Sequence, residues 1–134
     1  MEFGKQSRAS DEKFEVAELV FDSAEQGKRD GVRGSAAVAR QLLYQAGSVC
    51  IDMCMQPRPG SEEVVLIGQL LDSNRPDHGI KDIPVRLLQD GDTISRKTTN
   101  HVGEFEFGIE APQDLELAFG IAGRRTVIVP VPSI

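Results

Sequence analysis

The fold class is decided by residues 67–107, where short apolar segments alternate with turn residues. This stretch contains, in order, Ile67-Gly68-Gln69-Leu70-Leu71-Asp72, then Ile83-Pro84-Val85-Arg86-Leu87-Leu88, a Gly91-Asp92 turn, and Thr98-Thr99-Asn100-His101-Val102-Gly103-Glu104-Phe105-Glu106-Phe107. Successive side chains of a strand point to opposite faces, so Phe105 and Phe107 share one face and the two glutamates the other. Such alternation is typical of half-buried antiparallel strands. The stretch therefore predicts a small antiparallel β-sandwich.

The segments on either side continue this pattern. Residues 14–21 are apolar enough for a first strand, and their alternation breaks near Glu18, which indicates a bulge or an edge position. Residues 93–99 and 104–109 are expected to pair as a hairpin around residues 100–103, and further strands are expected at 115–119 and 125–131. About seven or eight short strands spaced in this way predict an all-β, transthyretin-like or immunoglobulin-like sandwich.

Residues 35–47 allow two interpretations. Ser35 can cap a helix that runs to Ala46 and ends at Gly47. Alternatively, residues 41–45 form a strand that turns at Gly47 into residues 48–55, which place Val49, Ile51, Met53 and Met55 on one face. A well-alternating strand directly after a glycine turn favours the hairpin. We expect at most one short helix, near residues 35–45.

Length and charge limit the class of protein. The 134 residues suit one domain, and we expect a flexible leader at residues 1–12 and a single sandwich domain at 13–134. The net charge of -6 argues against nucleic-acid binding, which needs a basic face, and against docking on anionic membranes. The first residues lack the apolar segment of a signal peptide, and no apolar run reaches the ~18 residues of a membrane helix. We therefore expect a cytoplasmic protein with two free thiols.

The residues that could carry chemistry do not form a recognisable site. Cys50, Asp52 and Cys54 share one strand face, but the two cysteines would lie ~13 Å apart along a strand, too far to share one metal ion. His78 and His101 lie in loops without ligand spacing, and neither has a legible nucleophile and orienting acid. We expect no metal, no cofactor and no catalytic activity.

The middle of the chain resembles the carboxypeptidase regulatory-like domain, a transthyretin-like sandwich related to the B-type repeats of bacterial surface proteins. The matching residues are Gly68, Asp72, the segment Pro84-Val85-Arg86-Leu87, the segment Thr98-Thr99-Asn100 and the segment Gly103-Glu104-Phe105-Glu106-Phe107. The chain departs from the family pattern at Asn100, where the family has Asp, and in lacking the late Pro-Gly-x-Tyr strand. Because the family's modules are usually accessory domains, the resemblance implies a non-catalytic role.

These observations predict a binding or scaffolding module for a protein partner. The loops at residues 72–82 and 100–103 offer Asp77, His78 and His101 as contacts. The terminal run at 126–132, with Val127 and Val129, is either an edge protected by its prolines or an open edge for a partner or a second copy. An alternative is a regulatory partner or substrate of a signalling or protease system, recognised through the charged loop at 22–34 with Lys28 and Arg29.

Overall fold

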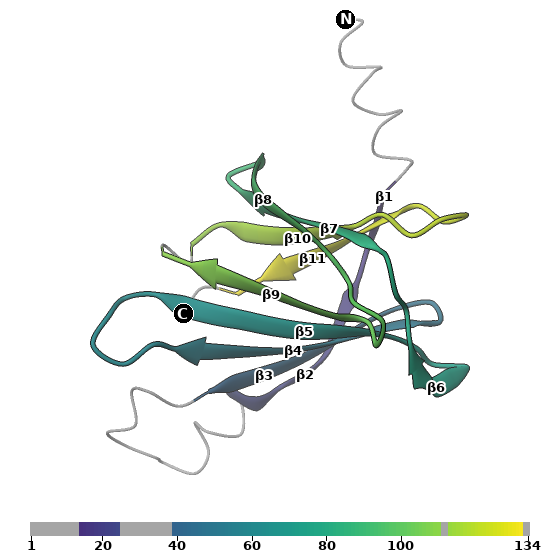
Figure 1. Cartoon of the computed structure of the whole chain (residues 1–134), viewed down its shortest axis with the longest axis horizontal. Coiled ribbons are helices and arrows are strands. Elements are labelled where there is room, and N and C mark those ends of the chain that lie inside the picture. The colour runs from purple at the N-terminus through teal and green to yellow at the C-terminus, as the bar shows by residue number, and fades with distance from the viewer. Residues whose placement is uncertain (1–13, 25–38, 111–112, 133–134) are drawn as a thin grey trace, which may run out of the picture.

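The protein is a sandwich of two stacked sheets, in a computed structural model that describes residues 14–24, 39–110 and 113–132 (Figure 1). Sheet A contains, from edge to edge, β1 (Phe14–Val16), β11 (Thr126–Val131), β10 (Leu115–Phe119), β7 (Pro84–Gln89) and β8 (Asp92–Thr98). Sheet B runs β2 (Glu18–Asp22), β3 (Arg40–Ala46), β4 (Val49–Pro57) and β5 (Val64–Asp72), with β6 (Arg75–Gly79) and β9 (Glu104–Ile109) both paired to β5. Every pairing is antiparallel except that of β1 with β11. The predicted all-β sandwich is confirmed.

The core lies between the two sheets and is made by the alternating positions that the sequence indicates. The apolar residues of β4 and β9 that share one strand face are all buried, namely Val49, Ile51, Met53, Met55, Phe105, Phe107 and Ile109. Phe105 of sheet B meets Phe119 of sheet A edge to face, with ring centroids 5.4 Å apart. Aromatic pairs in this arrangement add to the free energy gained from burial.

Gly68 is required by the packing of Phe105. The two residues are register partners on β5 and β9, and the phenyl ring lies directly over the glycine. A Cβ at position 68 would lie 2.2 Å from Cζ of Phe105. A glycine inside a strand indicates either a close approach to the backbone or a bulge, and here the ring of Phe105 makes the close approach.

The hairpin interpretation of residues 40–57 is confirmed. β3 and β4 pair from Arg40↔Met55 to Ala46↔Val49, and the turn between them uses Gly47 at φ 60°. The helical alternative is therefore wrong for residues 40–46; residues 25–38 lie outside the described part of the chain. The Asp90-Gly91 turn between β7 and β8 has positive φ at both residues, as a tight hairpin turn needs.

The expected hairpin of residues 93–99 with 104–109 is wrong. β8 pairs with β7 in sheet A, whereas β9 pairs with β5 in sheet B, so the intervening turn carries the chain from one sheet to the other. Buried Thr99 fixes this crossing: its Oγ1 accepts from the backbone N–H of Ile83 at 2.8 Å and donates to the carbonyl of Ile80 at 2.8 Å. The residues on the two sides of the turn alternate as they would in a hairpin, yet the two strands pair with different neighbours.

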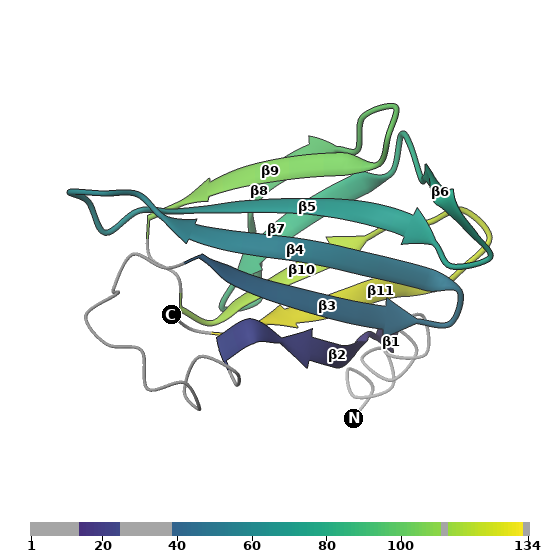
Figure 2. The ribbon, with the colours of Figure 1, turned by 90° about the horizontal axis from the view of Figure 1, so that it is seen from below.

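The first predicted strand also divides between the sheets. β1 ends at Val16, Ala17 is buried at the crossing and donates its N–H to the carbonyl of Ile128, and β2 begins at Glu18. The pairing of β2 with β3 shifts between Leu19 and Phe21, which confirms the expected bulge. One continuous segment therefore forms the edge of both sheets on the same side of the sandwich, as Figure 2 shows for β1 and β2.

Candidate functional site

The two loops singled out in the sequence meet at one end of the sandwich. β6 occupies part of the expected loop 72–82, and its last residue, Gly79, touches the turn at 100–103: a Cβ there would lie 1.8 Å from the carbonyl oxygen of Val102. Gln69 Nε2 donates to the same carbonyl at 2.9 Å, and the N–H of Leu70 donates to Gly103 at 2.8 Å. Residues 75–79 and 100–103 therefore form one surface, called here the loop platform.

Asn100 holds the turn half of the loop platform. Its Oδ1 accepts from the N–H groups of Val102 and Glu104 at 3.0 and 2.8 Å, and its Nδ2 donates to Glu104 Oε1 at 3.0 Å. Gly103 completes the turn at φ +83°. This network leaves His101 exposed at the tip, so the predicted contact residue lies where a partner can reach it.

The β6 half of the loop platform displays a small charged group. His78 Nδ1 and Asp77 Oδ1 are 3.0 Å apart, and Arg75 lies 3.4 Å from His78 Nε2. The hydrogen bond from His78 lowers the pKa of Asp77. The side chains of Asp77 and His78 are 84% and 56% exposed, and within the described ranges neither histidine touches a hydroxyl or thiol. This group can contact a partner, but it is not built as a nucleophilic site.

The cysteine face of β4 looks outward from sheet B. Cys50 and Cys54 are free thiols, partly exposed, and they pair in register with Leu71 and Ile67. Burial, and then the neighbouring Asp52 carboxylate, raises the pKa of Cys50, so its reactive thiolate form is suppressed. In the described part of the chain no three His, Cys, Asp or Glu side chains gather closely enough to hold a metal ion.

The largest concentration of exposed apolar side chains lies on residues 14–22, called here the β1–β2 edge. Val16, Leu19 and Val20 are 65, 45 and 54% exposed, and they make up half of the six large exposed hydrophobic residues in the described ranges. The other three lie on separate elements, namely Ile67 on β5, Ile94 on β8 and Val102 in the turn before β9. Single exposed apolar residues are ordinary, whereas several on one edge make that edge a candidate contact surface.

Two hollows flank the β1–β2 edge. One of about 590 Å³ is lined by Phe14 and Val16 with Leu88, Ile128, Arg86, Gly91 and Glu116 on the outer side of sheet A. Another of about 340 Å³ is lined by Ala17 and Leu19 with Tyr44, Pro130, Val131 and Pro132 at the gap between the sheets. Each strand of the edge thus has an apolar hollow beside it.

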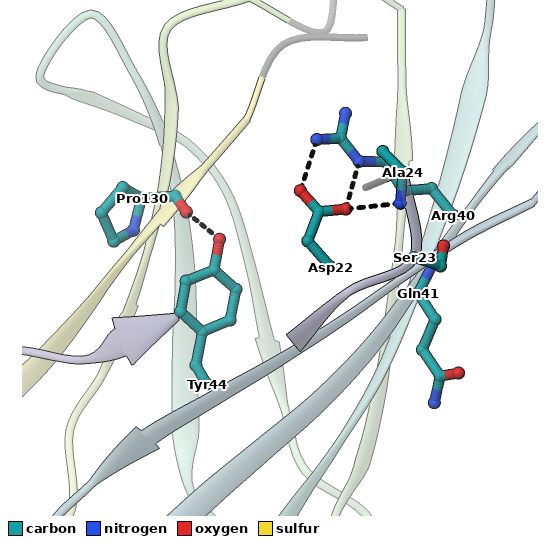
Figure 3. Close-up of polar contacts among 7 residues, drawn as sticks. All are labelled: Asp22, Ser23, Ala24, Arg40, Gln41, Tyr44 and Pro130. Atoms are coloured by element: carbon teal, nitrogen blue, oxygen red, sulfur yellow. Dashed lines mark hydrogen bonds and ion pairs between the residues drawn. The ribbon is translucent and has the colours of Figure 1, made fainter. Parts of the chain in front are cut away.

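Ion pairs hold both ends of the β1–β2 edge in place. At one end Arg40 binds Asp22 through Nε and a terminal nitrogen, at 3.0 and 2.8 Å, and the Asp22 side chain is only 10% exposed (Figure 3). At the other end Arg124 binds Glu15 at 2.9 Å and the carbonyl of Ala46 at 3.3 Å. The two-point contact of Arg40 with Asp22 fixes the orientation of that carboxylate, and Arg124 ties Glu15 to the backbone of β3 through one nitrogen.

Tyr44 closes the sandwich beneath this edge. Its hydroxyl donates to the carbonyl of Pro130 at 2.6 Å, which joins β3 of sheet B to β11 of sheet A (Figure 3). Burial, with a smaller contribution from the Asp22 carboxylate, raises the pKa of Tyr44 to about 12. The neutral phenol is therefore the form that the folded protein holds.

We expect this shift to be visible in a direct titration, because Tyr44 is the only tyrosine and the chain lacks tryptophan. Absorbance of the phenolate near 295 nm should rise with a pKa near 12 in the folded protein and near 10 in denaturant. Since the folded pKa is raised, stability is complete below pH 10 and falls between pH 10 and 12, by roughly 2–3 kcal/mol. Tyr44→Phe should lose this part of the alkaline destabilisation; a folded pKa near 10 would contradict the buried hydrogen bond.

The other predicted contact residues lie either in the core or outside the described part of the chain. Val127 and Val129 are fully buried, and β11 lies between β10 and β1, so these side chains belong to the core rather than to a docking edge. Lys28 and Arg29, and most of the predicted recognition loop 22–34, lie outside the described residues. The β1–β2 edge was signalled only by the broken alternation near Glu18.

Comparisons of this chain with family models, curated proteins and solved structures gave no match. No helix in the described ranges has the length and apolar character needed to span a membrane.

Proposed function

We propose that this protein is a non-catalytic binding module that recognises a protein partner through the β1–β2 edge. The observation that carries the proposal is the group Val16, Leu19 and Val20, each 45% exposed or more, on one open side of the sandwich. Among the described residues, β1 and β2 are terminal in their sheets, and each has a side to which no described strand is paired. An extended segment can add to such an edge through main-chain hydrogen bonds, and flanking pockets select its side chains.

The opposite side of the sandwich is a poorer edge for strand addition. β8 carries exposed Arg96 and Lys97 near its end, and cationic side chains are a common protection of edge strands. The β1–β2 edge has neither a lysine nor a proline between residues 14 and 22. Its short strands and its bulge limit how long an added segment can be, which suits a peptide-like partner rather than a second full sheet.

The charges along the edge favour a basic, apolar partner segment over a second copy of this chain. Of the three acids on the edge, Glu15 is paired with Arg124 and Asp22 with Arg40, and Glu18 takes part in no ion pair among the described residues. If two copies paired antiparallel about Glu18, the two Glu18 carboxylates would face each other, and like charges placed directly opposite destabilise a strand pair. A segment with apolar residues flanked by lysine or arginine meets no such repulsion.

Capture experiments with matched variants test the proposal. The full chain, immobilised as wild type, Val20→Lys or Ile94→Lys, is exposed to native lysate and the bound proteins are compared. Val20 and Ile94 are 54 and 51% exposed, so both substitutions add the same charge at similar exposure on opposite sides of the molecule. We expect a partner that is retained by wild type and Ile94→Lys and reduced at least about tenfold on Val20→Lys, as burial of an unpaired charge requires. Equal retention by the two variants would contradict the proposed surface.

A further inference from the structure

The outer face of sheet A carries an unusual pair of arginines. Arg86 of β7 and Arg96 of β8 are register partners in an antiparallel pair, and Arg86 is also the partner of Ala118 on β10. Residues opposite each other in such a pair point to the same face, with Cβ atoms about 5 Å apart. The two guanidinium groups therefore project from adjacent positions on the same side of the sheet.

This arrangement costs stability unless something neutralises it. Like charges directly opposite in a strand pair are destabilising. The ion pairs among the described residues involve Arg40, Arg58, Arg124 and His78, and neither Arg86 nor Arg96. Among the described residues, the side-chain hydrogen bond made by the pair is that of Arg86, which donates to the hydroxyl of Thr93 at 3.3 Å. Glu116 lines the larger hollow on the other side of Arg86, but no ion pair among the described residues joins it to either arginine.

The surroundings of the pair form a hollow with the chemistry of an anion site. It measures about 400 Å³ and is lined by the two arginines with Lys97, Thr98, Thr126, Pro84, Val85 and Gly120. Three of these residues are cationic, two carry hydroxyl donors, and none is acidic. Gly120 and Pro84 keep long side chains out of the middle of the hollow, which leaves room between the cations.

We propose that this hollow binds a soluble phosphate or sulfate group, held by Arg86 and Arg96 with Lys97 at the rim. A tetrahedral oxyanion presents several acceptor oxygens to two planar guanidinium forks, and such charge-assisted contacts are among the stronger hydrogen bonds in proteins. The bound charge would also remove the repulsion between the arginines. The net charge of -6 opposes approach to an anionic bilayer, so the group belongs to a soluble ligand rather than a lipid. This site adjoins the β1–β2 edge, because Arg86 also lines the hollow beside Phe14 and Val16, but the proposal does not depend on a partner at that edge.

Titration with inorganic phosphate at constant ionic strength tests the site. Amide NMR spectra of wild type, Arg96→Gln and Lys97→Gln monitor the titration. The control is Arg58→Gln, which removes one positive charge from the β4–β5 turn on the other sheet. We expect phosphate to shift resonances of β7, β8 and Gly120 in wild type and in the control. Arg96→Gln should weaken binding about tenfold or more, and Lys97→Gln less, because it lacks the planar fork.

Thermal unfolding distinguishes a site from non-specific charge screening. Phosphate should raise Tm of wild type and Arg58→Gln, while Arg96→Gln should show a smaller phosphate-dependent rise and a Tm in low salt equal to or above that of wild type, because the arginine repulsion is gone. Equal phosphate responses in all variants, or no phosphate-induced shifts in wild type, would overturn the proposal. Sedimentation of the protein with phosphatidylserine vesicles, abolished by Arg96→Gln, would overturn the assignment to a soluble ligand.

Discussion

Replacing Gly79 by alanine is expected to lower the free energy of unfolding by about 3 kcal/mol, the upper end of the usual cost of overpacking. A Cβ at this position would lie 1.8 Å from the carbonyl oxygen of Val102 and 2.8 Å from the N–H nitrogen of Gly103. Both atoms belong to the backbone of a turn fixed by Asn100, so they cannot move aside as a flexible side chain would. Urea unfolding measures the effect.

The control for this change is Gly108→Ala on β9. Nothing lies within 4 Å of a Cβ built there, so we expect a change within about 0.5 kcal/mol. A loss at Gly79 as small as that expected at Gly108 would mean that the contact between β6 and the turn at 100–103 does not form in solution, and the loop platform would then be two independent loops.

Truncating Phe107 to alanine is expected to cost about 4 kcal/mol, as for other large aromatic side chains in a core. Phe107 is 1% exposed on the inner face of β9, next to Phe105 at a ring separation of 6.2 Å. Removing the ring leaves a cavity between the two sheets that the surrounding strands cannot fill without moving apart. The loss should appear in chemical denaturation as a lower midpoint with an unchanged slope.

Ile94→Ala provides the matched comparison for Phe107. Ile94 is also apolar and lies on a strand, but it is 51% exposed, and we expect its truncation to change stability by less than about 0.5 kcal/mol. A loss below 1 kcal/mol for Phe107→Ala would place its ring outside a packed interior and would contradict the sandwich.

The core of this fold could be predicted because its strands are half-buried. In β4 and β9 every second residue is apolar. When one face of a strand is exposed to water, this alternation identifies the apolar face as the buried one. Gly68 could also be interpreted, because a glycine inside a strand implies that something approaches the backbone closely. The sequence was enough to predict a residue's role wherever that role depends only on the strand or turn that contains the residue.

Pairing partners were harder to predict, because alternation does not say which sheet a strand joins. Residues 93–109 have the pattern of a hairpin. However, Thr99 hydrogen-bonds two backbone groups where the chain leaves sheet A, and β9 pairs in sheet B. For the same reason β11 was expected to be an edge strand, either protected by its prolines or open, whereas in the structure β1 pairs with it and takes the edge position.

The loop platform and the arginine pair on sheet A show the same difference between local features, which can be predicted, and strand pairing, which cannot. The loop platform was anticipated, because turn residues and polar side chains identify loops, although nothing in the sequence showed that the loops touch. The arginine pair could not be anticipated: Arg86 and Arg96 are ten residues apart, and they become neighbours only through the register of β7 and β8 with its bulge between Leu87 and Leu88.

Docking of a partner on the β1–β2 edge is tested most directly by amide hydrogen exchange. Exchange is measured in the free protein and in the complex with the captured partner. We predict that a peptide spanning residues 14–22 exchanges quickly in the free protein, because each strand pairs with a described strand on one side only, and slowly in the complex. Protection confined to β8 or to the loop platform, with residues 14–22 unchanged, would contradict it.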